Sequence, residues 1–393
     1  MIDVNAHLHT PYSFSAFSDV KQALDMAASE GVKVVGINDF YSMDGYKDWK
    51  EGCATRALFP LFGIEFISLN AEDQAAGLRV NDPNNPGRTY ISGKGLAYPV
   101  ILSGEEARQL ADVKAESNAQ VERMCAKLNE HLKAVGEEFT LDFAKIAAEL
   151  TRGSIRERHL AKALRLAVER AAAAGVPAAQ ANRKASASGL QSAAEHYERI
   201  FGQPAKSDVS NVAAIENEIR SRLLKAGGAA FVPEDPKAFL PMTTVQRIIE
   251  AAGGIPTYPF LADDAKGNFT DFEGDLQKAA DTLKKRGFRS VEFITTRNTT
   301  AVLEQYAGYL EDEGFIVSFG SEHNTPAMEP VKLRTRDAAD LSDKLKTINY
   351  RGACAIAAHQ ADPVKWSISA LSSASISKNA VEAGDALIKR TVL

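Results

Sequence analysis

Two blocks of alternating strands and helices, separated by a long helical stretch, most constrain how this chain of 393 residues can fold. In the first block, apolar and mostly β-branched runs predict buried strands at residues 2–6, 32–37 and 59–66. A helix is expected over residues 19–30, with Asp19 as its N-cap. Short buried strands that alternate with helices are typical of parallel βα units.

The same alternation returns toward the carboxyl end of the chain. Further strands are expected at residues 255–260, 290–295, 315–321 and 354–358. Helices are expected at 243–252, where Thr243 is the expected cap, and at 272–286, 299–313 and 336–347. About seven strands favour a closed or nearly closed βα barrel over an open sheet. In such barrels the functional side chains lie at the carboxyl ends of the strands.

The stretch between the two blocks is alanine-rich and follows a helical period. Helices are expected over residues 105–133, 141–150, 155–174 and 212–225, with loops at 81–93 and 183–189. We therefore divide the chain into a first part of the barrel, a helical insertion, and a second part of the barrel with a C-terminal extension. Their expected bounds are 1–103, 104–238 and 239–393.

The bulk composition excludes several classes of protein. A hydrophobic content of 45% is ample for a core, and a net charge of −5 argues against a general nucleic-acid binder. The three cysteines, Cys53, Cys125 and Cys354, lie far apart in the sequence and are expected to be buried thiols in a reducing compartment. We find neither a secretory signal nor an apolar run that could span a membrane, so we expect a cytoplasmic protein.

His7 and His9 follow the first predicted strand and are the strongest candidates for chemistry. Residues two apart on a strand point to the same side, so both imidazoles could bind one metal ion. With seven histidines in the chain, a His-x-His pair by itself is weak evidence. The evidence for a functional site is strengthened by further charged and imidazole side chains at later strand ends, namely Asp39, Glu65, Glu292, Arg297, Glu322 and His323.

Four segments give the chain a resemblance to the PHP (polymerase and histidinol phosphatase) superfamily. They are His7-Leu8-His9-Thr10, Ile37-Asn38-Asp39-Phe40, Gly63-Ile64-Glu65 and Gly320-Ser321-Glu322. Residues 158–164 and 252–256 are similar to the metal-dependent phosphoesterase branch, and the likeness covers about residues 1–325. The resemblance implies an α/β fold, a distorted seven-stranded (β/α)7 TIM-like barrel with an inserted α-helical domain. It also implies one to three metal ions and hydrolysis of phosphate esters.

The resemblance implies one complete metal site, made of His7, His9, Glu65 and Glu322. The family's other sites are incomplete here, because residues that do not usually bind metals stand at their ligand positions: Phe14, Phe40, Asn324, Tyr258, and Tyr98 or Pro99. Two imidazoles and two carboxylates suit one zinc, manganese or iron ion per chain.

Other site residues have alternative interpretations. Asp39 could orient a ligand imidazole or bind the metal itself. His323 could be the general acid or a hydrogen-bonded structural histidine, and Tyr258 could donate a hydrogen bond to phosphate. Arg156, Arg158, His159 and Arg297 are candidate phosphate ligands, although an isolated arginine is more often a surface charge. The family's phosphate-binding arginine is replaced by Glu157.

These observations predict a metal-dependent hydrolase, foremost a phosphoesterase acting on a small phosphorylated metabolite or nucleotide. The helical insertion is expected to cover the barrel mouth and exclude long nucleic acids. One alternative is a catalytically degenerate PHP-like module that binds metal or acts as a sensor. Another is a mononuclear amidohydrolase-like enzyme. No membrane partner is expected, and the last seventy or so residues are available for contact with a second copy in a homo-oligomer.

Overall fold

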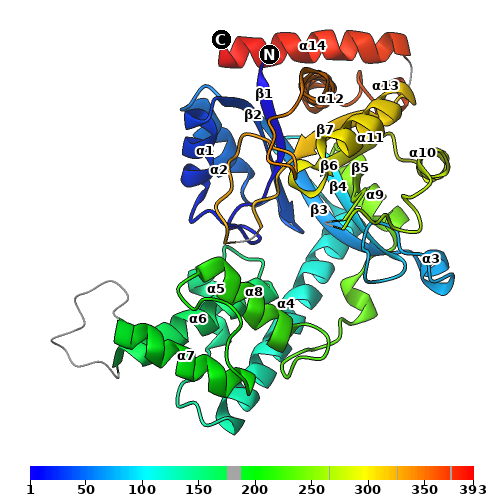
Figure 1. The fold of residues 1–393 in the computed structure, drawn as a ribbon. Coiled ribbons are helices and arrows are strands. Elements are labelled where there is room, and N and C mark those ends of the chain that lie inside the picture. Colours follow the sequence, from blue (N-terminus) through cyan, green and yellow to red (C-terminus); the bar gives the residue numbers. More distant parts are fainter. Residues whose placement is uncertain (175–186, 265, 325, 372–373) are drawn as a thin grey trace.

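In the computed structural model, which describes residues 1–174, 187–264, 266–324, 326–371 and 374–393, seven strands form one sheet in the order β1 to β7 (Figure 1). The strands are β1 Asp3–Leu8, β2 Val32–Phe40, β3 Phe59–Leu69, β4 Arg88–Lys94, β5 Ile255–Phe260, β6 Ser290–Ile294 and β7 Ile316–Gly320. Neighbouring strands are parallel, except that β4 runs antiparallel to both β3 and β5. The α/β class and the seven-stranded barrel are confirmed.

The barrel closes between β7 and β1, next to the two histidines. The amide of Glu322 donates to the carbonyl of His7 at 3.0 Å, and the amide of His9 donates to the carbonyl of Glu322 at 2.9 Å. A Cβ atom on Gly320 would lie 2.2 Å from the Cβ of His7. Only glycine therefore allows β7 to approach β1 this closely.

The seventh strand is not the one expected from the sequence. Residues 88–94, which we expected to belong mostly to a loop, form β4 and fill the gap between β3 and β5. The strand contains several polar residues and a glycine, so it lacks the apolar run by which the other strands were recognised. Its pairing sets Ser92 opposite Glu65.

Residues 354–358, expected to be a strand, lie instead in the helix α12, Asp343–Ala361. Every residue from Gly352 to His359 is buried, so the apolar run reflects a helix that is enclosed on all sides. Periodicity cannot distinguish such a helix from a buried strand. Side-chain amides of Asn349 and Gln360 bond to the backbone of β1 and β3, so α12 covers the amino-terminal end of the barrel.

Most of the remaining helices surround the barrel or cover α12. They are α1 Val20–Ser29, α2 Tyr46–Ala54, α3 Ala71–Ala75, α9 Met242–Ala251, α10 Leu276–Lys285, α11 Thr300–Asp312, α13 Ile368–Leu371 and α14 Ala374–Val392, with short 3-10 turns η3 Pro236–Ala238 and η4 Thr295–Arg297. Asp19 caps α1 with its side chain, as predicted, and Thr299 caps α11 in the same way. Thr243 does not cap α9, which begins at Met242 after Pro241.

Five helices form a separate unit at the carboxyl ends of the strands, on the opposite side of the barrel from α14 (Figure 1). They are α4 Gly104–Ala134, α5 Phe143–Leu150, α6 Glu157–Ala174, α7 Ala187–Phe201 and α8 Val212–Ile219, which continues as the π-helix η2 Arg220–Leu224. The unit has its own apolar core, with Leu128, Leu164 and Ile215 at its centre. Of the expected loop 183–189, residues 183–186 lie outside the described residues and the rest belong to α7. No helix in the described ranges is long and apolar enough to cross a membrane.

Candidate metal centre

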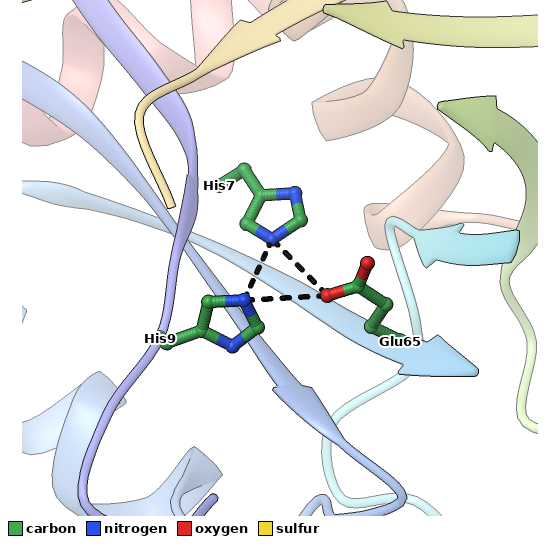
Figure 2. Close-up of side chains that lie close together, drawn as sticks. All are labelled: His7, His9 and Glu65. Atoms are coloured by element: carbon green, nitrogen blue, oxygen red, sulfur yellow. Dashed lines mark hydrogen bonds and ion pairs between the residues drawn. The ribbon is translucent and has the colours of Figure 1, made fainter. Parts of the chain in front are cut away.

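His7, His9 and Glu65 converge on one point at the carboxyl end of the barrel (Figure 2). The two Nε2 atoms lie 3.3 Å apart, and Oε2 of Glu65 is 3.5 Å from Nε2 of His7 and 3.3 Å from Nε2 of His9. All three residues are buried. His7 lies on β1, His9 follows it, and Glu65 lies on β3, so the strand positions predicted from the sequence do bring these side chains together.

The geometry of this group suits a divalent cation. Among the described residues, no hydrogen-bond donor reaches the buried Oε2 atom of Glu65. Ligand atoms about 2.0–2.2 Å from a tetrahedral zinc ion lie about 3.3–3.6 Å from one another. The three observed separations of 3.3, 3.3 and 3.5 Å therefore match one face of such a tetrahedron.

The charges of the group are coupled. Burial alone would lower the pKa of His7, but the charge of Glu292, a hydrogen bond to Glu292 and the nearby carboxylate of Glu65 raise this pKa to about 9. Burial alone would raise the pKa of Glu65, whereas the close approach of His7 and His9 lowers it to about 2. Without a metal, a proton on His7 thus takes the place of the cation.

The outer nitrogens of the two imidazoles have different partners. Nδ1 of His7 lies 3.0 Å from a carboxylate oxygen of Glu292 on β6. Nδ1 of His9 lies 3.5 Å from the hydroxyl of Ser13, which donates to Asp39 at 2.6 Å. Asp39 also accepts from the backbone amide of Thr10 at 2.7 Å, and burial raises its pKa. Asp39 thus reaches the metal group only through Ser13, as an indirect support of His9.

Aromatic rings enclose the His9 side of the group. Phe14 and Phe40 both stack on the imidazole of His9, with centroid distances of 5.1 and 5.4 Å. The guanidinium of Arg156 lies 5.0 Å from the centre of the Phe40 ring, and that of Arg158 lies 5.4 Å from the centre of the Phe14 ring. Packing thus fills the positions at which the resembled family has additional metal ligands.

The side chain of Glu322 does not join the three converging residues. Its two carboxylate oxygens accept from Nη2 of Arg297 at 2.7 and 2.9 Å, and one also accepts from the amide of Asn324 at 2.6 Å. Glu322 and His323 both have left-handed backbone conformations, with φ of 63° and 57°. Such strain in consecutive non-glycine residues is common at functional sites. The backbone of Glu322 adjoins the two histidines while its carboxylate pairs with Arg297.

A cavity of about 770 Å³ lies between the barrel mouth and the helical unit. Its barrel wall includes His7, Glu65, Arg297 and Glu322, and its helical wall includes Arg156, Arg158, Arg220 and Lys225. Arg220 pairs with Glu157 at 2.7 Å. Among the described residues, no carboxylate forms an ion pair with Arg156, Arg158 or Lys225.

Among these cations, Arg158 has the most unusual environment. Its Nη1 atom is buried and has no hydrogen-bond partner among the described residues. Burial, together with the charge of Arg220, lowers the pKa of Arg158 to about 10. A buried guanidinium without a partner is costly, so this wall of the cavity is suited to an anion.

Five of the predicted site residues do not line this cavity: His9 and Asp39, described above, and Tyr258, His159 and His323. The hydroxyl of Tyr258 donates to Glu273 at 2.7 Å, because Tyr258 points away from the barrel interior whereas its neighbour Pro259 lines the cavity. The Nδ1 atom of His159 accepts from the backbone amide of Arg156 at 2.9 Å, and burial lowers the pKa of His159 to about 4.

His323, expected as either a general acid or a structural residue, has both ring nitrogens engaged. Its Nδ1 lies 2.8 Å from the hydroxyl of Ser321, and its Nε2 donates to the carbonyl of Glu329 at 2.8 Å. Its ring also stacks on Phe17. This placement matches the structural alternative.

Sequence reasoning noted Glu292 at a strand end but gave it no role, and it did not place Lys94 in the site. Lys94 is buried and its ammonium lies 2.7 Å from Glu292. A lysine between two glycines was the available signal, but the segment was expected to be part of a loop rather than a strand in the barrel wall.

Comparisons with known proteins support the fold. No family model matches the chain, and no curated protein matches it. Two solved structures are similar over most of their length. A candidate metal-dependent phosphoesterase from Bifidobacterium adolescentis has a TM-score of 0.56 and 16% identity, covering 88% of this chain and 95% of that chain. An amidohydrolase from Chromobacterium violaceum, whose structure has bound sulfate and no metal, has a TM-score of 0.54 and 14% identity, covering 87% and 93%. Identities this low establish a shared architecture, so function has to be argued from the site.

Proposed function

We propose that this protein is a metal-dependent hydrolase, and specifically a phosphoesterase of the PHP type that acts on a small phosphorylated metabolite. The convergence of His7, His9 and Glu65 around a buried carboxylate oxygen without a donor carries the proposal. These three side chains would hold one zinc, manganese or iron ion. When bound, the ion supplies Lewis acidity, which activates water and polarises a phosphoryl oxygen.

The arginines of the cavity would bind and orient the phosphate. Arg156 and Arg158 project into the cavity without carboxylate partners, and Arg297 lies beside Glu322. A phosphate ester offers several oxygens that accept charge-assisted hydrogen bonds from guanidinium groups. An anionic substrate would compete with Glu322 for Arg297. The released carboxylate is our candidate fourth ligand, because its backbone is bonded to those of His7 and His9.

The cavity volume also bears on the size of the substrate. About 770 Å³ is in the range of pockets that bind small molecules, and the helical unit forms one wall of it. A small phosphorylated metabolite or a mononucleotide fits this space better than a nucleic-acid chain. The mixture of cations and carboxylates in the walls is consistent with one anionic group on a polar molecule.

Elemental analysis and an activity panel test the proposal together. The purified protein should contain about one equivalent of a transition metal and should hydrolyse phosphate monoesters, and a chelator should abolish this activity. The double variant His7→Ala/His9→Ala should lose both metal and activity. The matched variant His131→Ala/His196→Ala, in the helical unit, should keep both. Hydrolysis that survives in the first variant would refute the proposal.

Amide and lactone hydrolysis is the second candidate activity. The similarity to an amidohydrolase and a site with ligands for a single ion favour it. Parallel assays of phosphate esters, amides and lactones separate the two. A protein that holds stoichiometric metal but hydrolyses none of these would instead be a metal-binding or sensor module.

A further inference from the structure

A second group of charged side chains is buried on the side of His7 that faces away from the cavity. Glu292 accepts from Nδ1 of His7 at 3.0 Å, from the ammonium of Lys94 at 2.7 Å, and from the hydroxyl of Ser92. Glu292 is fully buried and Lys94 is 2% exposed. Glu292, Lys94 and Ser92 do not line the cavity, so substrate cannot contact them there.

The hydrogen bonds of Lys94 are completely satisfied. Besides Glu292, its ammonium donates to the carbonyl of Ala6 and to the side-chain oxygen of Asn38, both at 3.1 Å. Three donors therefore meet three acceptors. The amide of Asn38 is accommodated because residue 63 is glycine, where a Cβ atom would lie 2.4 Å from the Asn38 oxygen.

Stability alone does not account for two charges at this depth. Replacing a buried ion pair with apolar side chains of similar volume is often neutral or stabilising. In the described part of the chain, the imidazole of His7 is the one hydrogen-bond or ion-pair partner of Glu292 besides Lys94 and Ser92. A carboxylate can only accept a hydrogen bond, so this contact requires a proton on Nδ1 of His7. In the neutral imidazole the lone pair is then on Nε2, which faces His9 and Glu65.

We propose that Glu292 and Lys94 are positioning residues for the metal site: Glu292 fixes the tautomer and ring orientation of His7, and Lys94 anchors the carboxylate group of Glu292. This inference rests on the proposed metal site but adds two residues that no substrate touches. Carboxylate partners of ligand imidazoles raise the basicity of the ligand, and their loss typically lowers metal affinity 10- to 100-fold. In this protein the carboxylate partner of the imidazole is itself bound by Lys94, so the supporting chain has two residues, Glu292 and Lys94.

The experiment measures Zn²⁺ affinity by competition with a chromophoric chelator, together with thermal unfolding of the metal-free proteins. Glu292→Gln and the double variant Lys94→Met/Glu292→Gln should each bind Zn²⁺ about 10- to 100-fold more weakly than the unmodified protein. The double variant should still fold, because both buried charges are removed together. The buried pair Arg165–Glu216 of the helical unit provides the matched control. Arg165→Met/Glu216→Gln should leave Zn²⁺ affinity unchanged.

The outcomes separate this inference from the proposed function. If the unmodified protein binds Zn²⁺ and the folded double variant binds it equally well, the positioning role is refuted while the metal site stands. If neither Glu292→Gln nor the double variant folds, the pair is a structural requirement, which also refutes the inference. If the unmodified protein binds no transition metal, the proposed function itself fails.

Discussion

The charge state of His7 in the metal-free protein provides the sharpest test of the site. Its pKa is raised from 6.5 to about 9 in the folded protein. A difference of this size corresponds to about 3 kcal/mol, at 1.36 kcal/mol per pKa unit. Because the folded pKa is the higher one, this stabilisation is complete below pH 6.5 and is lost as the pH rises through 9. The metal-free protein should therefore become less stable over this interval.

The same proton competes with the metal. A group with a pKa of about 9 is about 1% deprotonated at pH 7 and about half deprotonated at pH 9, so Zn²⁺ affinity should rise about 50-fold between these pH values. NMR titration of the imidazole in the metal-free protein, assigned with a His7→Gln variant, measures the pKa directly. Denaturant unfolding at several pH values measures the stability. A His7 ring that titrates below pH 7 would refute the electrostatic reasoning.

Three further predictions concern residues around the site. Gly320→Ala should destabilise the protein by about 3 kcal/mol or more in denaturant unfolding, because the added methyl overlaps His7, whereas Gly274→Ala, with only ordinary contacts, should be well tolerated. Tyr258→Phe should cost about 1–3 kcal/mol of stability by removing the donor to the buried Glu273, with kcat and KM unchanged. Arg158→Met should raise the melting temperature while raising KM for a phosphate ester about tenfold, because an unpaired buried cation is removed from the substrate wall. A lower melting temperature with unchanged KM would contradict the role given to Arg158.

The fold could be predicted where burial leaves a clear pattern in the sequence. Runs such as residues 32–37 and 59–66 are buried on both faces of a parallel strand, and that requirement selects apolar, often β-branched side chains. β4 lacks such a run because some of its side chains, including Ser92 and Lys94, form hydrogen bonds and ion pairs in the polar interior of the barrel. The error at residues 354–358 has the opposite origin, since complete burial makes a helix as uniformly apolar as a strand.

The same reasoning explains how far the site could be predicted. Strand geometry indicated His7 and His9 and placed Glu65 among the polar residues at strand ends, because the carboxyl ends of parallel strands share one edge. The resemblance to the PHP superfamily then selected Glu65 as a ligand. The direction of a single side chain is harder to predict, as Tyr258 shows, since one step along a strand reverses the face. Partners such as Lys94 and Glu292 lie 198 positions apart in the sequence, and no local pattern predicts such a contact.

Because α12 covers the amino-terminal end of the barrel, the candidate metal centre is reached from the carboxyl end. A molecule that reaches the metal group from the side of the helical unit has to leave by the way it came. Product must therefore depart before the next substrate can enter, and the two compete for the same empty enzyme. For the proposed hydrolase, we therefore expect product inhibition that is competitive with substrate, whichever bond it cleaves.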